Sequence, residues 1–467
     1  MAITPSLTGA TSSDYFASIA NKILVQGRLE GEQSWRLAMA SKIERTWQYF
    51  YNNKSTLEAD IRRHPNEHPN DYQAKPKHTL SLVDRAVQQY FSNVYGLPVL
   101  RLVPNYPEFE SVVKEINQGL DRKNRYRSIQ ISTEIAGTTA VIPRAREDGS
   151  IFYDIYTMEQ MFPSLDSLTG DLTGLSLETI TDFHDKSVSR IEAWTADGWA
   201  VYEDGKLIEQ NDNPYGRIPA VIFRAEDGGA LWWGISRAMK LVDANREVNE
   251  MFTDLASLQR DQTASLLALS GADGEQGEEM LAVVGNNRYV SLPEGVQAQY
   301  LTPDVPLENV MKVLQYRIDQ ALKDGAVIEV SKEGKTPESG FAMSIRIRPE
   351  ANVMKHKREI YADADAELNE VAVLVQDVAK TGGAKRLAAD FHVETHFDTE
   401  GLIPKTSDEL YKETMAQEIA ISLGIKSPVD IIQEQYKLSR QDAERRFNDN
   451  QLLNAGVNRD GMSQGAS

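Results

Sequence analysis

The chain of 467 residues contains no cysteine. This absence excludes disulfide bonds, thiolate zinc sites, iron–sulfur clusters and cysteine nucleophiles. No apolar run approaches the length that crosses a bilayer, so we expect neither an integral membrane protein nor a membrane partner. The sequence does not open with a basic region followed by an apolar stretch, which predicts synthesis and assembly in a cytoplasm.

Basic residues are scarce relative to acidic ones. The chain has 50 Lys and Arg against 69 Asp and Glu, a formal net charge of −19. Such a chain repels nucleic acid at long range, which argues against a protein that coats DNA. Any contact with DNA must therefore be local or weak. The length and the hydrophobic content of 41% predict a folded protein with two or three structural sections.

Apolar residues recur every three to four positions in several segments, which predicts helices. One helix covers residues 34–51, a second runs from Leu80 to a stop at Gly96, a long one follows Trp233, and another runs from Leu307 to Asp324. From Phe341 a further long stretch is helical by composition, and Pro349 is expected to kink or interrupt it. Three helical patterns occupy the last sixty residues, and the first of them closes on Gly424.

Alternating apolar and polar residues predict strands between these helices. The strongest signal is an antiparallel meander over residues 187–210, in which two Asp-Gly turns separate three alternating runs. The remaining strand predictions are residues 99–103, a stretch from about 128 to 142, 151–158, an apolar strand within 213–223, a short β-and-loop insertion over 264–303, and 386–398. The predicted fold class is α+β.

Gly334, Lys335 and Thr336 match the end of the phosphate-binding P-loop. That motif also needs a glycine five positions earlier, and this position is Glu329, whose negative charge would face the phosphate. A helix must begin after the motif so that its positive end faces the anion, but loop-forming residues that start with Pro337 follow here. The pattern therefore argues against nucleotide binding and for a mixed-charge loop.

A second chemical candidate is the segment His392-Val393-Glu394-Thr395-His396. Alternate residues of a strand share one face, so His392, Glu394 and His396 could converge on a zinc or iron ion. The alternative is the polar outer face of a half-buried strand. No HExxH helix or other acidic motif is placed to complete the site, so we favour the polar face and expect no metal and no cofactor.

The predicted long helix after residue 341 carries two adjacent blocks of opposite charge. Blocks of this kind suit one helix that makes staggered contacts with copies of itself. The residues assigned to such contacts between subunits are Arg346, Arg348, Lys355, Lys357, Arg358, Asp363, Asp365 and Glu367.

Several landmarks occur in a characteristic order along most of the chain. They are Tyr95-Gly96-Leu97-Pro98, Gly137, Asp148-Gly149, Phe162 to Asp166, Asn213 to Pro219, Arg246 to Ser257, Pro306-Leu307-Glu308, Ser339 to Met343 and Leu423 to Ser427. Their order and spacing over residues 30–450 resemble the portal proteins of tailed bacteriophages, of the type found in siphophages. The resemblance implies a structural protein rather than an enzyme.

The resemblance implies a portal fold with a mixed α/β wing, two long stem helices, a small α/β clip and a helical crown, assembled as a ring of usually twelve subunits. The implied sections are the wing over 1–232, stem helix 1 over 233–262, the clip over 263–303, stem helix 2 over 304–324, a tunnel loop over 325–342, the second part of the wing over 343–404, and the crown and tail over 405–467.

The resemblance also implies the partners. They are double-stranded DNA that passes without sequence specificity, the large subunit of the terminase motor, major capsid and scaffolding proteins, and a head-tail adaptor, at the portal vertex of a virion. The implied tunnel-loop residues are Ser331, Lys332, Glu333, Gly334, Lys335 and Thr336. The implied clip residues that face the motor or neck are Asp273, Glu275, Glu278 and Glu279.

Two other classes of protein stay open at this point. One is a metal-dependent enzyme that uses the strand with His392, Glu394 and His396. The other is a virion structural or adaptor protein that assembles through the same helices without a DNA channel. Metal analysis addresses the first class, and an image of the assembly addresses the second.

The two interpretations of the Gly334-Lys335-Thr336 segment make different predictions for Lys335→Ala. If the segment is a mixed-charge loop, the substitution leaves assembly intact and alters at most DNA packaging or retention, because ATP is hydrolysed by the partner motor. The measurement is ATP hydrolysis by the purified chain and its variant. An intrinsic ATPase that disappears in Lys335→Ala would overturn the loop interpretation.

Overall fold

The computed structural model describes residues 30–65, 67–96, 98–118, 122–166, 168–183, 186–228, 232–263, 266–270, 297–301, 307–327, 340–381, 388, 390–397, 407–436, 440 and 443–448. The chain divides into two compact units. Unit 1 contains residues 1–44, 86–239 and 326–467, and unit 2 contains residues 45–85 and 240–325. None of the described helices has an apolar stretch that could cross a bilayer.

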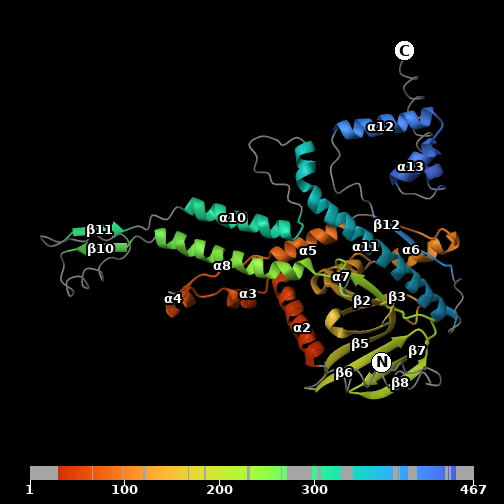
Figure 1. Cartoon of the computed structure of the whole chain (residues 1–467), viewed down its shortest axis with the longest axis horizontal. Coiled ribbons are helices and arrows are strands. Elements are labelled where there is room, and N and C mark those ends of the chain that lie inside the picture. The colour runs from red at the N-terminus through yellow and green to blue at the C-terminus, as the bar shows by residue number, and fades with distance from the viewer. Residues whose placement is uncertain are drawn as a thin grey trace, which may run out of the picture. The chain divides into compact units, whose positions relative to one another are not determined.

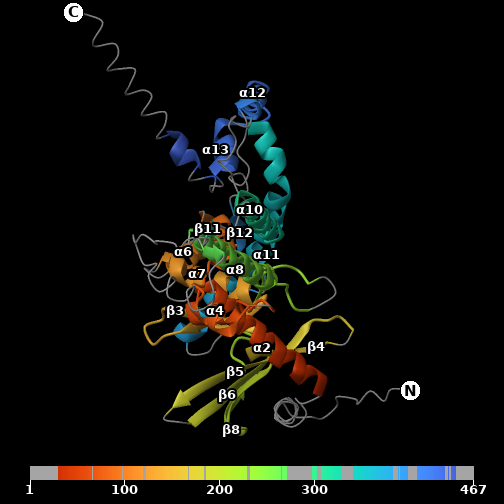
Figure 2. The same cartoon turned by 90° about the vertical axis from the view of Figure 1, so that its left-hand side faces the viewer.

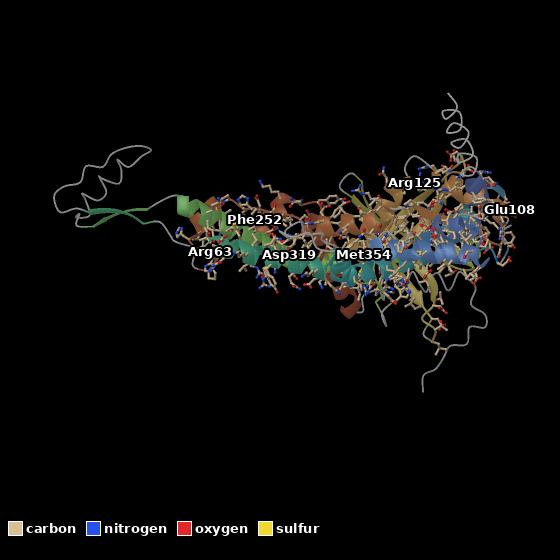
Figure 3. The ribbon with its side chains drawn as sticks, turned by 90° about the horizontal axis from the view of Figure 1, so that it is seen from above. Arg63, Glu108, Arg125, Phe252, Asp319 and Met354 are labelled. Carbon is tan, nitrogen blue, oxygen red and sulfur yellow. The ribbon has the colours of Figure 1, made fainter. Side chains whose placement is uncertain are left out.

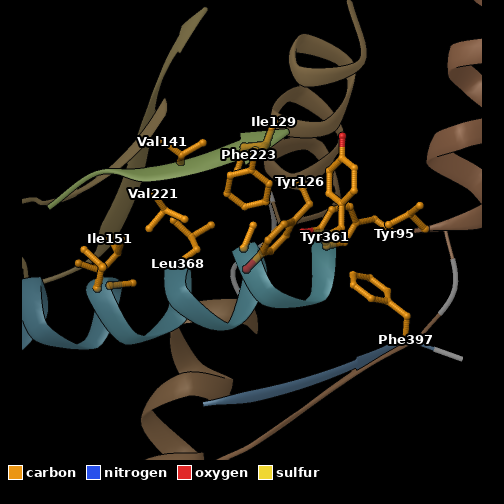
Figure 4. Close-up of a cluster of buried hydrophobic side chains, with 14 of the residues drawn as sticks. Tyr95, Tyr126, Ile129, Val141, Ile151, Val221, Phe223, Tyr361, Leu368 and Phe397 are labelled. Atoms are coloured by element: carbon orange, nitrogen blue, oxygen red, sulfur yellow. The ribbon is translucent and has the colours of Figure 1, made fainter. Parts of the chain in front are cut away.

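Unit 1 is built on α11 (Gly340–Thr381), a helix of 42 residues. Its buried face packs on an antiparallel three-stranded sheet of order β3-β2-β9. Figure 4 shows Tyr361 and Leu368 of α11 pointing toward Val221 and Phe223 of the sheet. All four side chains are buried, so this layer is the main core of the unit. The strands are β2 (Thr138–Ala145), β3 (Ile151–Thr157) and β9 (Val221–Arg224).

Helices and a strand pair complete this core. The predicted strand at residues 99–103 is confirmed as β1, and it pairs antiparallel with β12 so that Val99 faces Phe397. The predicted strand over 386–398 is shorter in the structure, because only its last part forms β12. The elements are α5 (Leu82–Asn93), β1 (Val99–Leu102), η2 (Pro107–Phe109), α6 (Glu110–Gln118), α7 (Arg122–Ala136) and β12 (Glu394–Phe397). The helix α2 (Glu30–Phe50) has residues in both units.

The helix α7 corrects one prediction. The strand expected from residue 128 begins only at Thr138, and the preceding residues are helical. Tyr126, Ile129 and Thr133 are all buried, and their spacing of three to four residues fits the inner face of a helix. The β-branched Ile and Thr side chains suggested a strand, but tertiary packing decides the conformation. Gly137, with φ +85°, then ends the helix in a left-handed conformation that favours glycine.

The predicted meander is confirmed. It forms three strands of an antiparallel five-stranded sheet of order β4-β5-β6-β7-β8, which is seen in Figures 1 and 2. The turn between the last two strands places Asp204 and Gly205 at positive φ, as expected for an Asp-Gly hairpin. The strands are β4 (Met161–Leu165), β5 (Leu172–Phe183), β6 (Lys186–Thr195), β7 (Gly198–Glu203) and β8 (Lys206–Asp212), and η3 (Met158–Gln160) precedes them.

Pro349 does not interrupt α11, which is continuous through it. Proline lacks the N–H that would bond to the carbonyl four residues earlier, and this loss bends helices. Figure 1 shows a bend near the start of α11, in keeping with the predicted kink.

Two short helices follow in the C-terminal part of unit 1, as predicted. They are α12 (Ser407–Ser422) and α13 (Pro428–Tyr436), and residues 443–448 are also helical. The end of α12 confirms the predicted stop at Gly424, which has φ +70°. The N–H groups of Gly424 and Ile425 donate to the carbonyl oxygens of Ile421 and Ala420, at 3.0 and 2.9 Å, in a Schellman motif.

Unit 2 contains the two predicted long helices that flank the insertion. Figures 1 and 3 show α8 and α10 lying side by side, with Phe252 and Asp319 on neighbouring helices. The predicted β-and-loop insertion contains two antiparallel strands, in which Leu266 faces Leu301. The elements are α3 (Lys54–Asp60), α4 (Pro69–Ala74), α8 (Arg237–Thr263), β10 (Leu266–Ser270), β11 (Gln297–Leu301) and α10 (Leu307–Asp324).

The start of α13 yields a prediction about acid. Asp430 accepts hydrogen bonds from the N–H and the hydroxyl of Ser427, both at 2.7 Å, and the backbone bond in particular lowers the pKa of Asp430 below its ordinary value of 3.8. A depressed folded pKa means that stabilisation is complete above pH 3.8 and is lost as the pH falls through the folded value. We expect the first turn of α13 to lose protection from hydrogen exchange in acid.

The matched control is Asp430→Asn, whose amide does not titrate in this range. Its α13 protection should be lower at neutral pH and should lack the acid transition. The same acid transition in both proteins would assign the effect to another carboxylate.

Candidate functional site

The first turn of α8 is held by backbone groups and glycines of unit 1. Ser236 caps the helix, because its hydroxyl accepts from the N–H of Met239 at 2.9 Å and donates to the carbonyl of Glu134 at 2.6 Å. Gly137 and Gly234 bring their backbones so close that a Cβ atom added to Gly234 would lie 2.5 Å from the carbonyl oxygen of Gly137. Any larger residue at this position would push the two segments apart.

A buried lysine of α11 lies beside this turn. The Nζ atom of Lys357 donates to the Glu134 carboxylate at 2.7 Å and to the carbonyl of Ala225 at 2.8 Å, and it lies 4.0 Å from the Glu226 carboxylate. The side chains of Lys357 and Glu134 are completely buried. A charge in this position is tolerated only because each group has a partner, and removal of one partner of such a pair costs about 3–5 kcal/mol. Glu226 in turn pairs with Arg237, the first residue of α8.

The pKa of Glu134 reflects this balance. Burial raises the pKa above its ordinary value, while the Lys357 ammonium and hydrogen bonds from Lys357 and Tyr361 oppose the rise. The hydroxyl of Tyr361 lies 3.1 Å from the Glu134 carboxylate, and burial raises the pKa of Tyr361 well above its ordinary value. The group is a buried ion pair in which each charge has a partner of opposite sign.

A second buried ion pair lies further along α11. The guanidinium of Arg101 on β1 donates two hydrogen bonds to Asp365, both at 2.7 Å. Asp365 also accepts from the hydroxyls of Tyr95 and Thr395, at 3.1 and 2.9 Å. A bidentate Arg–carboxylate pair fixes orientation as well as charge, so this network aligns α11 with the β1-β12 pair.

These contacts change the interpretation of the charged blocks on α11. Lys357, Arg358 and Asp365 were assigned to contacts between subunits, but all three are buried and have partners in the same chain. Their charges therefore bind α11 to its own subunit. Glu367 pairs with Arg217 of the same unit.

The other members of the charged blocks remain candidates for contacts between subunits. Arg348, Lys355 and Asp363 are exposed, and for these three residues the assignment stays a prediction. The side chain of Arg346 lies outside the described part of the chain.

In unit 2, a ladder of polar side chains holds α8 to the extended segment 78–82. Asn245 donates to the carbonyl of Leu80 at 2.8 Å and accepts from the N–H of Leu82 at 2.7 Å. Asn249 accepts from the N–H of Leu80 at 3.0 Å, and Thr253 accepts from the N–H of His78 at 3.0 Å.

The hydrogen bonds of the ladder can form because the spacing of residues along α8 matches the spacing along segment 78–82. Four residues of helix rise about 6 Å and two residues of extended chain about 6.6 Å, so each rung meets alternate backbone groups. Asn245, Asn249 and Thr253 are all buried. The sequence analysis did not identify the role of these three residues. The available signal was two amides and a hydroxyl repeated at every fourth position.

The exposed surfaces of the two long helices of unit 2 differ in charge. On α8 the acidic residues Asp243, Glu247 and Asp254 lie on one stripe, with side chains that are 79%, 50% and 60% exposed. Glu247 is 3.6 Å from Arg317 of α10. On α10 the face opposite the buried Leu314 and Leu322 is exposed, and the carboxylates of Asp319 and Asp324 lie at its two edges. It presents Asn309, Lys312, Val313, Tyr316, Gln320 and Lys323.

A stripe of large apolar side chains is also exposed on α12. Tyr411, Met415 and Ile419 follow one another at every fourth position, so they lie on one face of the helix, and Leu423 continues beyond its end. Single exposed apolar residues are ordinary, but an aligned series on one helix is typical of a surface that is covered by another molecule.

The segment with His392, Glu394 and His396 does not form a three-ligand cluster. His392 lies 2.7 Å from Glu370 of α11, and His396 lies 3.4 Å from Glu394. Thr395, between them, faces the buried Asp365. No group of three or more potential metal ligands occurs among the residues that the structure describes. The arrangement is that of a half-exposed strand with surface ion pairs.

The implied tunnel-loop residues Ser331 to Thr336 lie outside the described residues, as do the implied clip residues Asp273 to Glu279. Their roles stay predictions.

The ladder on α8 yields a comparison between two neighbouring rungs. We expect Asn245→Ala to lower the free energy of unfolding by about 2–4 kcal/mol, because it leaves the buried N–H of Leu82 and the carbonyl of Leu80 without a partner. We expect a smaller loss for Asn249→Ala, because among the described residues its Nδ2 atom has no hydrogen-bond partner. Urea unfolding of the monomeric chain measures both losses. Equal losses would show that the hydrogen bonds of the ladder do not determine stability here.

Comparison with known proteins assigns the family. Residues 39–418 match the family model described as phage portal protein, SPP1 Gp6-like. No curated protein matches the chain at a significant level.

Three solved structures are similar to the chain at low identity. A chain from the virion of the native gene transfer agent (GTA) particle is 12% identical, with a TM-score of 0.45, and the match covers 76% of this chain and 90% of that one. A chain from the neck of the native GTA particle with C12 symmetry is 12% identical, with a TM-score of 0.44 and coverage of 74% and 88%. A chain from the neck of the empty particle with C6 symmetry is 12% identical, with a TM-score of 0.45 and coverage of 77% and 90%.

Proposed function

Because its residues 39–418 match the family model, the chain belongs to the SPP1 Gp6-like phage portal protein family, and we propose that it forms a ring-shaped DNA channel at one vertex of a phage capsid. DNA enters through this ring during packaging and leaves through it during ejection. The subunit has a structural role, and the terminase motor supplies ATP hydrolysis. The family match carries this proposal.

The surface of α10 supports assembly into a ring. Val313 and Tyr316 are 51% and 64% exposed in the single chain, on the side of the helix away from Leu314. Burial of such side chains against another subunit is favourable by roughly 25 cal/mol per Å² of apolar surface. The same face carries Lys312 and Lys323, which suit an acidic partner. We place against it the acidic stripe of α8 in the neighbouring subunit, whose charge is complementary.

The charge of the chain supports transit of DNA rather than tight binding. A net charge of −19 per subunit, repeated around a ring, repels phosphates at long range. DNA must slide through a portal, so an acidic wall with scattered cations holds it loosely. The tunnel loop with Lys332 and Lys335 provides cations for brief contacts with passing phosphates.

The remaining partners follow from the proposed position at the vertex. The β10-β11 pair and the residues between its strands form the clip. The acidic residues from Asp273 to Glu279 dock first on the large terminase subunit and later on a head-tail adaptor. The charged surface of α11 and the apolar stripe of α12 are available to neighbouring subunits. Capsid and scaffolding proteins surround the ring.

Electron microscopy or native mass spectrometry of the purified chain tests the assembly. We expect rings of twelve subunits with an axial hole of about 20 Å or more, wide enough for a duplex. Counting subunits in the images or from the native mass checks the number. A population of monomers alone would contradict the proposal. A ring whose hole is too narrow for a duplex would favour a structural or adaptor protein without a channel.

A substitution at the proposed interface tests how the ring is held together. Val313→Asp removes apolar burial and places a carboxylate against an acidic neighbour, so we expect loss of rings. Stability of the isolated subunit should change by less than about 0.5 kcal/mol, because the site is exposed.

The control is Leu207→Asp on β8, where the apolar side chain is 52% exposed, close to the 51% of Val313. We expect rings to persist in this variant. If both variants form rings in equal yield, Val313 and its face of α10 do not lie in the interface between subunits.

A further inference from the structure

Three charged side chains connect α11 to the first turn of α8. Lys357 lies 4.0 Å from the Glu226 carboxylate, and the same Oε1 atom of Glu226 accepts a hydrogen bond from Arg237. The contacts lie in unit 1, which includes the first residues of α8 up to Met239. The carboxylate of Glu226 is thus shared between a cation of α11 and the first cation of α8.

The backbone atoms of the same acidic residues hold the turn as well. The carbonyl of Glu226 accepts from the N–H of Ile235 at 3.1 Å, and the carbonyl of Glu134 accepts from the hydroxyl of Ser236 at 2.6 Å. Lys357 contacts the side chains of both acidic residues. The Lys357 ammonium therefore contacts the side chains of Glu226 and Glu134, whose backbone carbonyl groups accept hydrogen bonds from Ile235 and Ser236.

We propose that Lys357 is a positioning residue that acts through Glu226 on Arg237 and so fixes the start of α8. The direct contact with Glu134 stabilises the buried ammonium of Lys357, but it does not orient the carboxylate of Glu226. If the ammonium of Lys357 were removed, the Glu226 carboxylate would keep only Arg237 of these two cations to orient it. The link to DNA transport rests on the proposed function, in which α8 is a stem helix of the channel.

Lys357 lies 17 residues after Gly340, the first residue of α11, which corresponds to about 26 Å along a helix. The contacts of Lys357 therefore connect the start of α8 to the middle of α11.

Hydrogen exchange over residues 237–241 tests the proposal, and the informative amides are those from Met239 onward. The N–H of Met239 bonds to the Ser236 hydroxyl, whereas the first N–H groups of a helix have no acceptor within it. Glu226→Gln removes the shared charge but keeps the backbone and the size of the side chain, and its site is partly exposed, at 17%. We expect exchange at these amides to increase about tenfold, the effect of losing one charged hydrogen bond. Lys357→Met with Glu134→Gln removes the ammonium without leaving a buried charge, and it should increase exchange at the same amides.

The matched control is Asp365→Asn, which weakens the other buried ion pair of α11. It should lower overall stability, without a selective increase at residues 237–241. An equal increase in the control, or no increase in the Glu226 and Lys357 variants, would overturn the proposal.

Exchanging the charges at positions 226 and 237 tests whether Lys357 is needed or whether the pair of Glu226 and Arg237 acts alone. If only residues 226 and 237 matter, Glu226→Arg combined with Arg237→Glu restores protection. If Lys357 acts through position 226, the exchanged arginine faces the ammonium, and protection is restored only when Lys357→Met and Glu134→Gln are added. Restoration by the exchange alone would refute a role for Lys357.

These exchange measurements are made on the full chain and do not depend on ring formation. Imaging the same samples reports assembly separately. Absence of rings in the unsubstituted protein would therefore overturn the channel proposal, while the exchange results would still decide the role of Lys357.

Discussion

A buried ammonium group must be surrounded by acceptors, and in this protein that requirement organises unit 1 around one lysine. Lys357 draws together a carboxylate from α7, a carbonyl that follows β9 and a carboxylate that binds the start of α8. An apolar side chain could fill the same volume, but it would not specify which groups surround it. A buried ion pair adds little net stability, yet it penalises every arrangement that separates the charges. The main gain is specificity of packing.

The helices and the meander could be predicted from the sequence because their signals are local. The three strands around the Asp-Gly turns and the two long helices of unit 2 are confirmed, since alternation and three-to-four spacing report directly on a buried face. The conformation of residues 128–136 could not be predicted in this way, because Ile and Thr favour strands locally and the choice of helix depends on α11 and the sheet.

The charged residues were harder to interpret than the apolar ones. A block of Lys and Arg on a helix usually marks a solvated face, and neither Lys357 nor Asp365 differs in sequence from its exposed neighbours Lys355 and Asp363. Their partners Glu134 and Arg101 lie more than two hundred residues away. The pairing is a property of the tertiary fold, and a single sequence contains no signal that joins such distant positions.

The polar ladder of α8 has a consequence for temperature. Most contacts between a helix and its neighbours depend on burial of apolar surface, which weakens on cooling. The contacts of Asn245, Asn249 and Thr253 with segment 78–82 are hydrogen bonds, whose formation lacks the large heat-capacity change of apolar burial. The attachment of this segment to α8 should therefore persist in the cold, when the apolar layer beneath α11 has lost part of its driving force.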